Sequence, residues 1–504
     1  MLRAIGAVAV RIAGQLIPDP YIFAIILSAI IFMMGITMTD TTPMAMVTYW
    51  YDGFWNLLQF GMQMILLLLF GYVLAGSPPV RRLIARAASV PKSPGQAILL
   101  IVFLTMTFSY INWGLGLIVG AISAREVCIQ AKRIGIRVHF PLAAAAGFSS
   151  MMFFGGGLSA TAPLLVNSDN HFLYHEIGRI PITDTILSPM NLIMMASWFI
   201  LMPFVYRAMH PKADDTIEIE LDNAPTTARA AAASYSSQPD APPHADGLHA
   251  RARLAGQTAA SGYNPDGMSM GAAAVLNSPM QGAVMQAPAQ PEVTVAAWLE
   301  NAAPLCWIVA AAGLAYIGNH FLTKGFDLNL NIANFTMMIA GMIAYKTPIA
   351  YVRAIDEGIR SCGQLALQFP FYAGIMGMMV GSGLVTVFAG WLIDISTPAT
   401  LPLTSFLSTG LVNIFIPSAG GQWAVQGPML MEAAKTLGVD YGLIILAFTH
   451  GDQWTNGIQP LWMLPLLGVT ALKVNQVVGY TAVVMFASFF IWGLGLLFLP
   501  MIFI

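Results

Sequence analysis

Long apolar segments alternate with short polar ones along most of the chain. A helix that crosses a bilayer needs about 20 mostly apolar residues. Seven segments are expected to be full spans: 21–39, 58–76, 187–207, 298–318, 330–346, 366–391 and 477–500. Two short amphipathic segments, 79–92 and 348–362, are expected to lie along the membrane surface. The pattern predicts an all-α polytopic membrane protein.

Two further apolar segments, at matching places in the two halves, have a polar centre. Residues 95–130 are interrupted at 109–116, and residues 402–436 at 413–423, and the flanking arms look too short for ordinary spanning helices. We interpret both as re-entrant hairpins. Backbone that leaves helical geometry at membrane depth must be buried in protein or line a wet cavity. Paired interruptions of this kind point to the midplane substrate site of a secondary transporter.

Each hairpin is followed by a second interrupted segment. These segments, 140–166 and 440–468, are apolar but broken by glycine and polar residues. We predict that each is a broken transmembrane helix that supplies another wall of the site. The order span, hairpin, broken helix and span therefore occurs twice.

Basic residues in short loops predict the orientation, because they favour the cytoplasmic side. The basic connections are 81–92, 132–137 and 346–360, whereas 40–57, 167–186 and 392–401 together hold one basic residue, Arg179. This places the N-terminus in the cytoplasm and the C-terminus outside. The first hairpin then enters from the cytoplasm and the second from outside, which makes the two halves inverted repeats. Lys435, on the outer side, is the one departure.

The amino-acid composition is typical of a membrane protein and distinguishes one segment as a linker. Of 504 residues, 57% are hydrophobic and 9% charged, against about 25% charged in soluble proteins. The net charge of −2 gives no sign of a nucleic-acid partner. Residues 211–292 are rich in Ala, Pro, Gly, Ser and Gln, and such a composition buries too little apolar surface to fold alone. We predict a disordered cytoplasmic linker there, between a first half at 1–210 and a second half at 293–504.

The N-terminal residues are expected to form a surface helix. A signal peptide needs an uninterrupted apolar stretch of about 7–15 residues. Arg11 interrupts the apolar run here, so a retained amphipathic helix at the membrane surface is the better interpretation.

The hairpin centres carry groups that suit a small anion or a bare cation. Helix N-termini direct partial positive charge at an anion, and unwound carbonyl groups suit Na⁺. The candidate substrate-binding residues in the first hairpin are Ser109, Asn112, Trp113 and Gly114, and those in the second are Ser418, Gly420, Gly421, Gln422 and Trp423. The alternative is a glycine-kinked helix packed on a neighbour, since Gly and Pro are common in membrane helices.

Asp452 is an ionisable residue inside an apolar segment, and such residues are functional candidates by default. It could bind Na⁺ or carry a proton, with His450 nearby on the chain, or be a structural carboxylate that accepts hydrogen bonds from hairpin amides. Arg125 could be a counter-charge for the substrate or pair with a neighbouring helix. Its sequence neighbour Glu126 is not expected to face it.

The sequence lacks the motifs that metal sites, hydrolases and ATP-driven pumps require. The cysteines have no metal-ligand spacing. His171, His175 and Glu176 do not form a zinc-protease motif. We find neither a nucleophile elbow nor a phosphate-binding loop. We expect neither an enzyme nor an ATP-driven pump, with no cofactor and no resident metal beyond a coupling Na⁺ or H⁺.

Three strings give a family resemblance. Phe108–Gly114, Asn413–Trp423 and Gly451–Asn456 resemble the short-chain fatty acid transporter family, the AtoE type, within the larger ion transporter superfamily. The likeness covers nearly everything except 211–292. It implies an elevator-type, homodimeric carrier in the bacterial inner membrane for small monocarboxylates such as acetoacetate or butyrate. Dicarboxylate carriers of the superfamily hold their ligand between Ser-Asn-Thr tips, whereas this chain has Asn112-Trp113-Gly114 and Ser418-Ala419-Gly420.

The sequence therefore predicts a cation-coupled carrier, with ion coupling assigned to Asp452, Asn456 and Thr161. A carrier of the same fold for C4-dicarboxylates or another small organic anion is the near alternative. A channel or an intramembrane enzyme is the distant one.

Overall fold

The computed structural model describes residues 20–220 and 294–503, which are helical and contain no strand. Within these ranges, eight helices are long and apolar enough to cross a membrane, judged by length and composition. They are α2 (Pro20–Met38), α4 (Leu58–Ala75), α6 (Pro94–Ile111), α7 (Trp113–Arg133), α11 (Pro189–Ala208), α15 (Ala303–Lys324), α18 (Gly363–Ser382) and α24 (Val474–Phe498). The all-helical membrane architecture expected from the sequence is confirmed.

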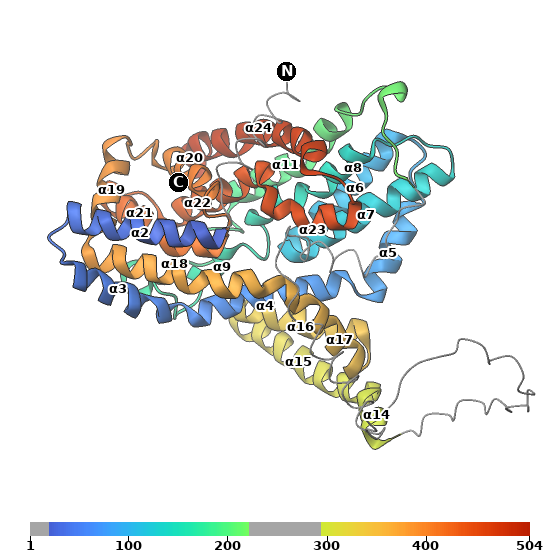
Figure 1. The fold of residues 1–504 in the computed structure, drawn as a ribbon, viewed down its shortest axis with the longest axis horizontal. Coiled ribbons are helices and arrows are strands. Elements are labelled where there is room, and N and C mark those ends of the chain that lie inside the picture. The colour runs from blue at the N-terminus through green and yellow to red at the C-terminus, as the bar shows by residue number, and fades with distance from the viewer. Residues whose placement is uncertain (1–19, 221–293, 504) are drawn as a thin grey trace, which may run out of the picture. The chain divides into compact units, whose positions relative to one another are not determined.

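A helical hairpin followed by a broken helix occurs in each half (Figure 1). In the first half these are α6 and α7, then α8 (Phe140–Gly147), two 3₁₀ turns (Ser149–Met152 and Phe154–Gly156) and α9 (Thr161–Val166). In the second half they are α20 (Leu401–Asn413), α21 (Ala419–Leu437), α22 (Tyr441–Thr455), a 3₁₀ turn (Asn456–Ile458) and α23 (Pro460–Thr470). The inverted orientation of the halves stays a prediction.

The arms of the first hairpin are longer than we expected from the sequence. α6 has 18 residues and α7 has 21, and each is long enough to cross a membrane by itself. The polar residue Ser109 does not end α6, because its hydroxyl donates to the Ser150 carbonyl at 2.9 Å and is thus satisfied inside the protein. The helix ends only at Ile111, with Asn112 as its C-cap.

One long helix was not expected from the sequence, and two helices were expected as a single span. α3 (Pro43–Asn56) lies in a segment that we took for a connection, and it packs along α18. A Cβ atom at Gly53 would lie 2.8 Å from the Gly377 Cα, so a pair of glycines permits this close crossing. The expected single span at 366–391 is divided into α18 and α19 (Leu384–Asp394), because Gly383 takes a left-handed conformation with φ of 79°.

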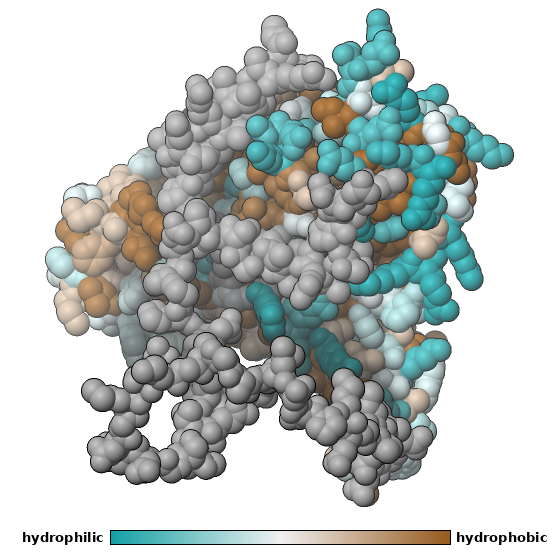
Figure 2. Space-filling model, turned by 45° about the vertical axis from the view of Figure 1, so that its right-hand side comes forward, coloured by the Kyte–Doolittle hydropathy of each residue, from teal (hydrophilic) through white to brown (hydrophobic). Residues whose placement is uncertain are grey.

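Shorter helices complete the described part of the chain. They are α5 (Pro78–Ala88), α10 (Tyr174–Ile177), α14 (Val295–Glu300), α16 (Leu330–Tyr345), α17 (Pro348–Gly358), α25 (Pro500–Phe503) and two 3₁₀ turns, Ala213–Asp215 and Ile359–Cys362. α5 and α17 lie where surface helices were expected. On the face in Figure 2, hydrophilic residues gather on the side that carries α5 and the α7–α8 connection, the region of the first two basic loops.

Two predictions fall mostly outside the described residues: the surface helix near the N-terminus and the linker at 211–292. The described start of the linker lies against the first half. Phe140 N–H donates to the Ile217 carbonyl at 2.8 Å, Arg137 pairs with Glu218 at 2.8 Å, and Lys132 Nζ donates to the Ile219 carbonyl at 2.6 Å. Residues 217–219 are therefore held in place, although their composition predicts no structure.

A polar cluster joins the first half to α15 and α16. Arg179 Nη2 lies 2.7 Å from Asp327 Oδ1, and Asn167 Nδ2 donates to the same oxygen at 2.8 Å. His320 Nε2 hydrogen-bonds to the Asp327 carbonyl at 2.8 Å. Asp327 and His320 are buried, whereas the Arg179 side chain is 39% exposed. These contacts link the segment that contains Asn167 and Arg179 to the turn between α15 and α16.

We expect the ion pair between Arg179 and Asp327 to contribute more to the free energy of unfolding than an exposed ion pair does. A double-mutant cycle with Arg179→Gln and Asp327→Asn, measured as the free energy of unfolding in mixed micelles, should give a coupling of about 1–2 kcal/mol, because one partner is buried. The matched control is Arg137 with Glu218, whose side chains are 50% and 27% exposed and whose coupling should be about 0–1 kcal/mol. Equal couplings at the two pairs would contradict the expectation.

A candidate substrate and cation site

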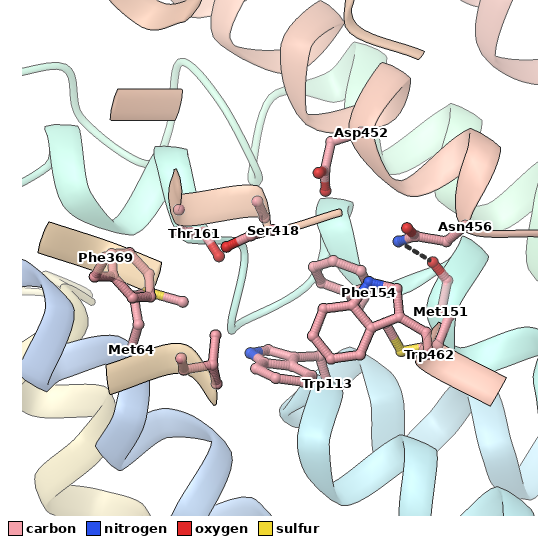
Figure 3. Close-up of a pocket in the computed structure, with 13 residues that line it drawn as sticks. Met64, Trp113, Met151, Phe154, Thr161, Phe369, Ser418, Asp452, Asn456 and Trp462 are labelled. Atoms are coloured by element: carbon pink, nitrogen blue, oxygen red, sulfur yellow. Dashed lines mark hydrogen bonds between the residues drawn. The ribbon is translucent and has the colours of Figure 1, made fainter. Parts of the chain in front are cut away.

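A cavity lies where both hairpin tips and both broken helices meet. It is lined by Met64, Trp113, Met151, Phe154, Thr161, Leu365, Phe369, Ser418, Ala419, Gly420, Asp452, Asn456 and Trp462. Figure 3 draws these residues as sticks around one space. The volume open to the centres of water molecules is about 30 Å³, enough for one or two waters. A larger organic molecule would need the walls to move apart.

Asn112 forms the tip of the first hairpin. It is the N-cap of α7, with its Oδ1 accepting from Leu115 N–H at 2.9 Å, and its Nδ2 donates to the Leu67 carbonyl of α4 at 3.1 Å. Trp113 N–H donates to Ser159 Oγ at 2.9 Å. The tip is thus tied both to α4 and to the first broken helix.

The second tip is tied to the second broken helix in a comparable way. Gln459 Nε2 donates to the carbonyls of Asn413 and Ile414 at 3.0 and 2.7 Å. Ser418 is the N-cap of α21 and accepts from Gly421 N–H at 3.3 Å. These bonds satisfy the backbone where helical geometry ends, as burial in an apolar setting requires.

Asp452 points into the cavity from α22 (Figure 3). Its side chain is buried, and its Oδ1 has no hydrogen-bond partner among the described residues. The alternative of a structural carboxylate satisfied by hairpin amides is therefore not what the structure has. A buried carboxylate oxygen without a partner is costly, which favours a role in binding.

His450 lies near Asp452 on the chain but is not its partner. Gln453 Oε1 accepts a hydrogen bond from Gly155 N–H at 2.6 Å, so the amide nitrogen of Gln453 must face the histidine. The Nδ1 atom of His450 therefore accepts from Gln453 Nε2 at 2.8 Å. The Nε2 atom of His450 must then carry the proton, and it donates to Asn191 Oδ1 at 3.0 Å. The ring also stacks on Trp492, with centroids 4.3 Å apart. His450 is a neutral structural residue that joins α22 to α11 and α24.

Six of the twelve residues proposed from the sequence line the cavity: Trp113, Thr161, Ser418, Gly420, Asp452 and Asn456. The other six pack around it without lining it: Ser109, Asn112, Gly114, Gly421, Gln422 and Trp423. Trp423, for example, is fully buried against Phe448 with ring centroids 4.8 Å apart. The structure thus brings half of the set to one cavity.

Several lining residues were missed. Trp462 contacts Trp113 edge to face with centroids 5.5 Å apart, and it follows Pro460, a break that could have drawn attention to it. Met64, Leu365 and Phe369 lie on ordinary spanning helices, where nothing in the sequence separates them from other apolar residues.

The cavity lining contains a carboxylate and no basic side chain. Arg125 lies elsewhere, beside Glu218 and residues 469–472, and its Nη1 is 3.3 Å from Glu126 Oε1. The expectation that these sequence neighbours do not face each other was wrong, because their long side chains bend around the helix. Positive potential at the cavity comes instead from the N-termini of α7 and α21, which begin at Trp113 and Ala419.

Comparison with known proteins identifies the family. The family model for "Short chain fatty acid transporter" matches residues 1–264 and 276–499. The chain belongs to the short-chain fatty acid transporter family. Two relatives share the name "Putative short-chain fatty acid transporter". The one from Escherichia coli (strain K12) is 35% identical over 98% of this chain and 99% of its own length. The one from Haemophilus influenzae is 32% identical, with the same two coverages.

The fold of this family member also resembles a solved structure. The YdaH transporter of Alcanivorax borkumensis, whose crystal structure is described as having an unusual topology, matches 96% of this chain and 97% of its own. The TM-score is 0.52 at 17% sequence identity, so the likeness concerns the fold alone. The resemblance to short-chain fatty acid transporters inferred from the three sequence strings is confirmed. The expectation that it leaves out 211–292 was wrong, because the family match includes 211–264 and 276–292.

Proposed function

We propose that the protein is a secondary active transporter that carries small monocarboxylates, such as acetoacetate or butyrate, together with a cation. The observation that carries this proposal is the charge of the cavity lining: Asp452 contributes a carboxylate, and no Lys or Arg balances it. A carboxylate substrate would add a second negative charge in a setting of low dielectric. Binding therefore requires cations or protons to enter with the substrate.

The lining matches both ends of a short fatty acid. The N-termini of α7 and α21 offer partial positive charge and the Ser418 hydroxyl for the carboxylate. Phe154, Phe369 and Trp462 offer apolar surface for a short tail. A dicarboxylate would place its second charge against that apolar wall, which makes it the less favourable substrate.

An elevator motion is consistent with the packing of the second tip. Gly420 lies against Phe60 and Phe369, and Gly421 lies against Tyr372 of α18. Without side chains at these two positions, the start of α21 can slide along the aromatic surface. We propose that the hairpins and broken helices move past α4 and α18 as one unit, in a homodimer of the inner membrane with the N-terminus in the cytoplasm.

The test is uptake of labelled butyrate into proteoliposomes under an imposed Na⁺ gradient and, separately, under a proton gradient. We expect concentrative, saturable uptake with counterflow under at least one gradient. Unlabelled succinate should compete poorly. Strong competition by succinate would favour the dicarboxylate alternative, and flux that neither saturates nor shows counterflow would favour a channel.

A further inference from the structure

Five buried side-chain oxygens on α20, α21 and α22 have no hydrogen-bond partner among the described residues. Ser405 Oγ lies one turn before Thr409 on α20, farther from the second tip, and the other four lie nearer to it. These four are Thr409 Oγ1 and Asn413 Oδ1 on α20, Gln422 Oε1 on α21 and Asp452 Oδ1 on α22. All four side chains are at most 3% exposed. Most buried polar groups in proteins are hydrogen-bonded. The four oxygens nearest to the second tip lie on three helices that pack together, which calls for a common explanation.

The orientation of the Asn413 amide is fixed by its neighbours. Its Nδ2 donates to Thr455 Oγ1 at 3.0 Å and to Asn456 Oδ1 at 2.9 Å. Both of these oxygens are acceptors, because the Thr455 hydroxyl donates to the Gly410 carbonyl and Asn456 Nδ2 donates to the Met151 carbonyl. The nitrogen of Asn413 must face them, so its oxygen is left for another ligand.

The Gln422 amide is fixed in the same manner. Its Nε2 donates to the Thr409 carbonyl at 2.8 Å and to Gln426 Oε1 at 2.9 Å. A backbone carbonyl can only accept, so the nitrogen must face Thr409 and Oε1 must point elsewhere.

The four side chains come from one region. Thr409 and Asn413 are four residues apart and share a face of α20, and Gln422 is bonded to Thr409. Asp452 follows Gly451, where an added Cβ would lie 2.8 Å from the Thr409 Cβ, so α20 and α22 are in close contact at this level. Asn413 in turn binds Asn456, one turn after Asp452.

A set of oxygen ligands with one carboxylate suits a hard monovalent cation. With Na⁺ bound, the group of one carboxylate and three neutral oxygens is electrically neutral, whereas a divalent ion would leave a buried positive charge. A proton on Asp452 would not provide ligands for the three other oxygens. We propose that Thr409, Asn413, Gln422 and Asp452 bind Na⁺.

The Na⁺ site rests on the proposed function, and it names the cation that would be carried with the substrate. Asp452 also lines the substrate cavity, so one carboxylate would contact the ion on one side and face the substrate on the other. An ion held there would offset the negative charge that a bound carboxylate meets, and binding of ion and substrate would favour each other.

Thr409→Val tests the site, because it removes an oxygen that makes no hydrogen bond and keeps the shape of the side chain. The unfolding temperature of the full-length protein in nanodiscs is measured at increasing NaCl concentrations. Choline chloride keeps the ionic strength constant. Na⁺ should raise the unfolding temperature of the wild type to a plateau, and K⁺ should not. Thr409→Val should need at least ten-fold more Na⁺ for the same shift.

Two further variants make the result decisive. Thr105→Val removes a buried hydroxyl on α6 of the first hairpin that likewise has no partner within the described part of the chain, and it should leave the Na⁺ response unchanged. Thr409→Ser keeps the oxygen and should respond as the wild type does. Equal Na⁺ responses of Thr409→Val and Thr105→Val would overturn the site, as would a wild type that does not respond to Na⁺.

Failure of the site and failure of the proposed function give different results. Butyrate uptake driven by a proton gradient in a protein without a Na⁺ response would overturn the Na⁺ site and leave the carrier intact. The expected Na⁺ responses in a protein that takes up no fatty acid would support the site and overturn the proposed substrate.

Discussion

Asp452→Asn is expected to abolish concentrative uptake of butyrate, with at least a ten-fold loss of accumulation in proteoliposomes. The substitution keeps the size of the side chain and removes its charge. A cation would then lose the one charged group in the cavity lining, and the substrate could no longer be driven by the cation gradient. The variant should still insert in the membrane, because its wild-type Oδ1 makes no hydrogen bond that the fold would lose.

Asp440→Asn is the matched control on the same helix. Asp440 is exposed and caps α22 by accepting from Leu443 N–H at 2.9 Å, and Asn caps helices equally well. Accumulation should therefore equal that of the wild type. Full accumulation by Asp452→Asn would refute the coupling role of this carboxylate.

Asn112→Ala is expected to lower the free energy of unfolding by about 3 kcal/mol. The loss of the N-cap bond to Leu115 N–H costs about 1 kcal/mol, and the buried Leu67 carbonyl loses its partner at about 1–3 kcal/mol more. Both bonds are present in the structure at 3.1 and 2.9 Å. Unfolding in mixed micelles at increasing SDS measures the change.

Ser93→Ala provides the comparison for this prediction. Ser93 caps α6 by accepting from Gln96 N–H at 3.3 Å, but this bond is exposed. Its removal should cost about 1 kcal/mol or less. If the two substitutions cost the same, the contact between Asn112 and α4 contributes nothing to stability.

The breaks in the membrane helices could be predicted because their cause is local. Polar and glycine residues at 109–116 and 413–423 stand out against apolar arms, and the structure ends α6 and α20 inside these stretches. α3 could not be found in this way. Its tyrosines, tryptophans and Asp52 give a mixed pattern, and its helix is stabilised by packing against α18, which is more than 300 residues away in sequence.

The cavity lining could be predicted only in part, because it depends on helical phase. Ser418 and Gly420 stand at the start of α21 and reach the cavity, whereas Gln422 and Trp423 stand on the next turn and face α20 and α22. All four residues have the same local setting in the sequence. The position of the first helical residue decides which of them face the cavity, and this is set by the Ser418 cap and the neighbouring helices.

The lone carboxylate of the cavity also makes the proposed carrier sensitive to membrane voltage. Without cation and substrate, the moving unit would carry the negative charge of Asp452 across the membrane. Moving one such charge across a membrane potential of 100 mV changes the free energy by about 2.3 kcal/mol. A change of this size shifts the equilibrium constant between the two positions of the unit by more than ten-fold. The number of cations that accompany each fatty acid then decides whether voltage drives the loaded step, the empty return step or both, and the sign of the transport current would report that number.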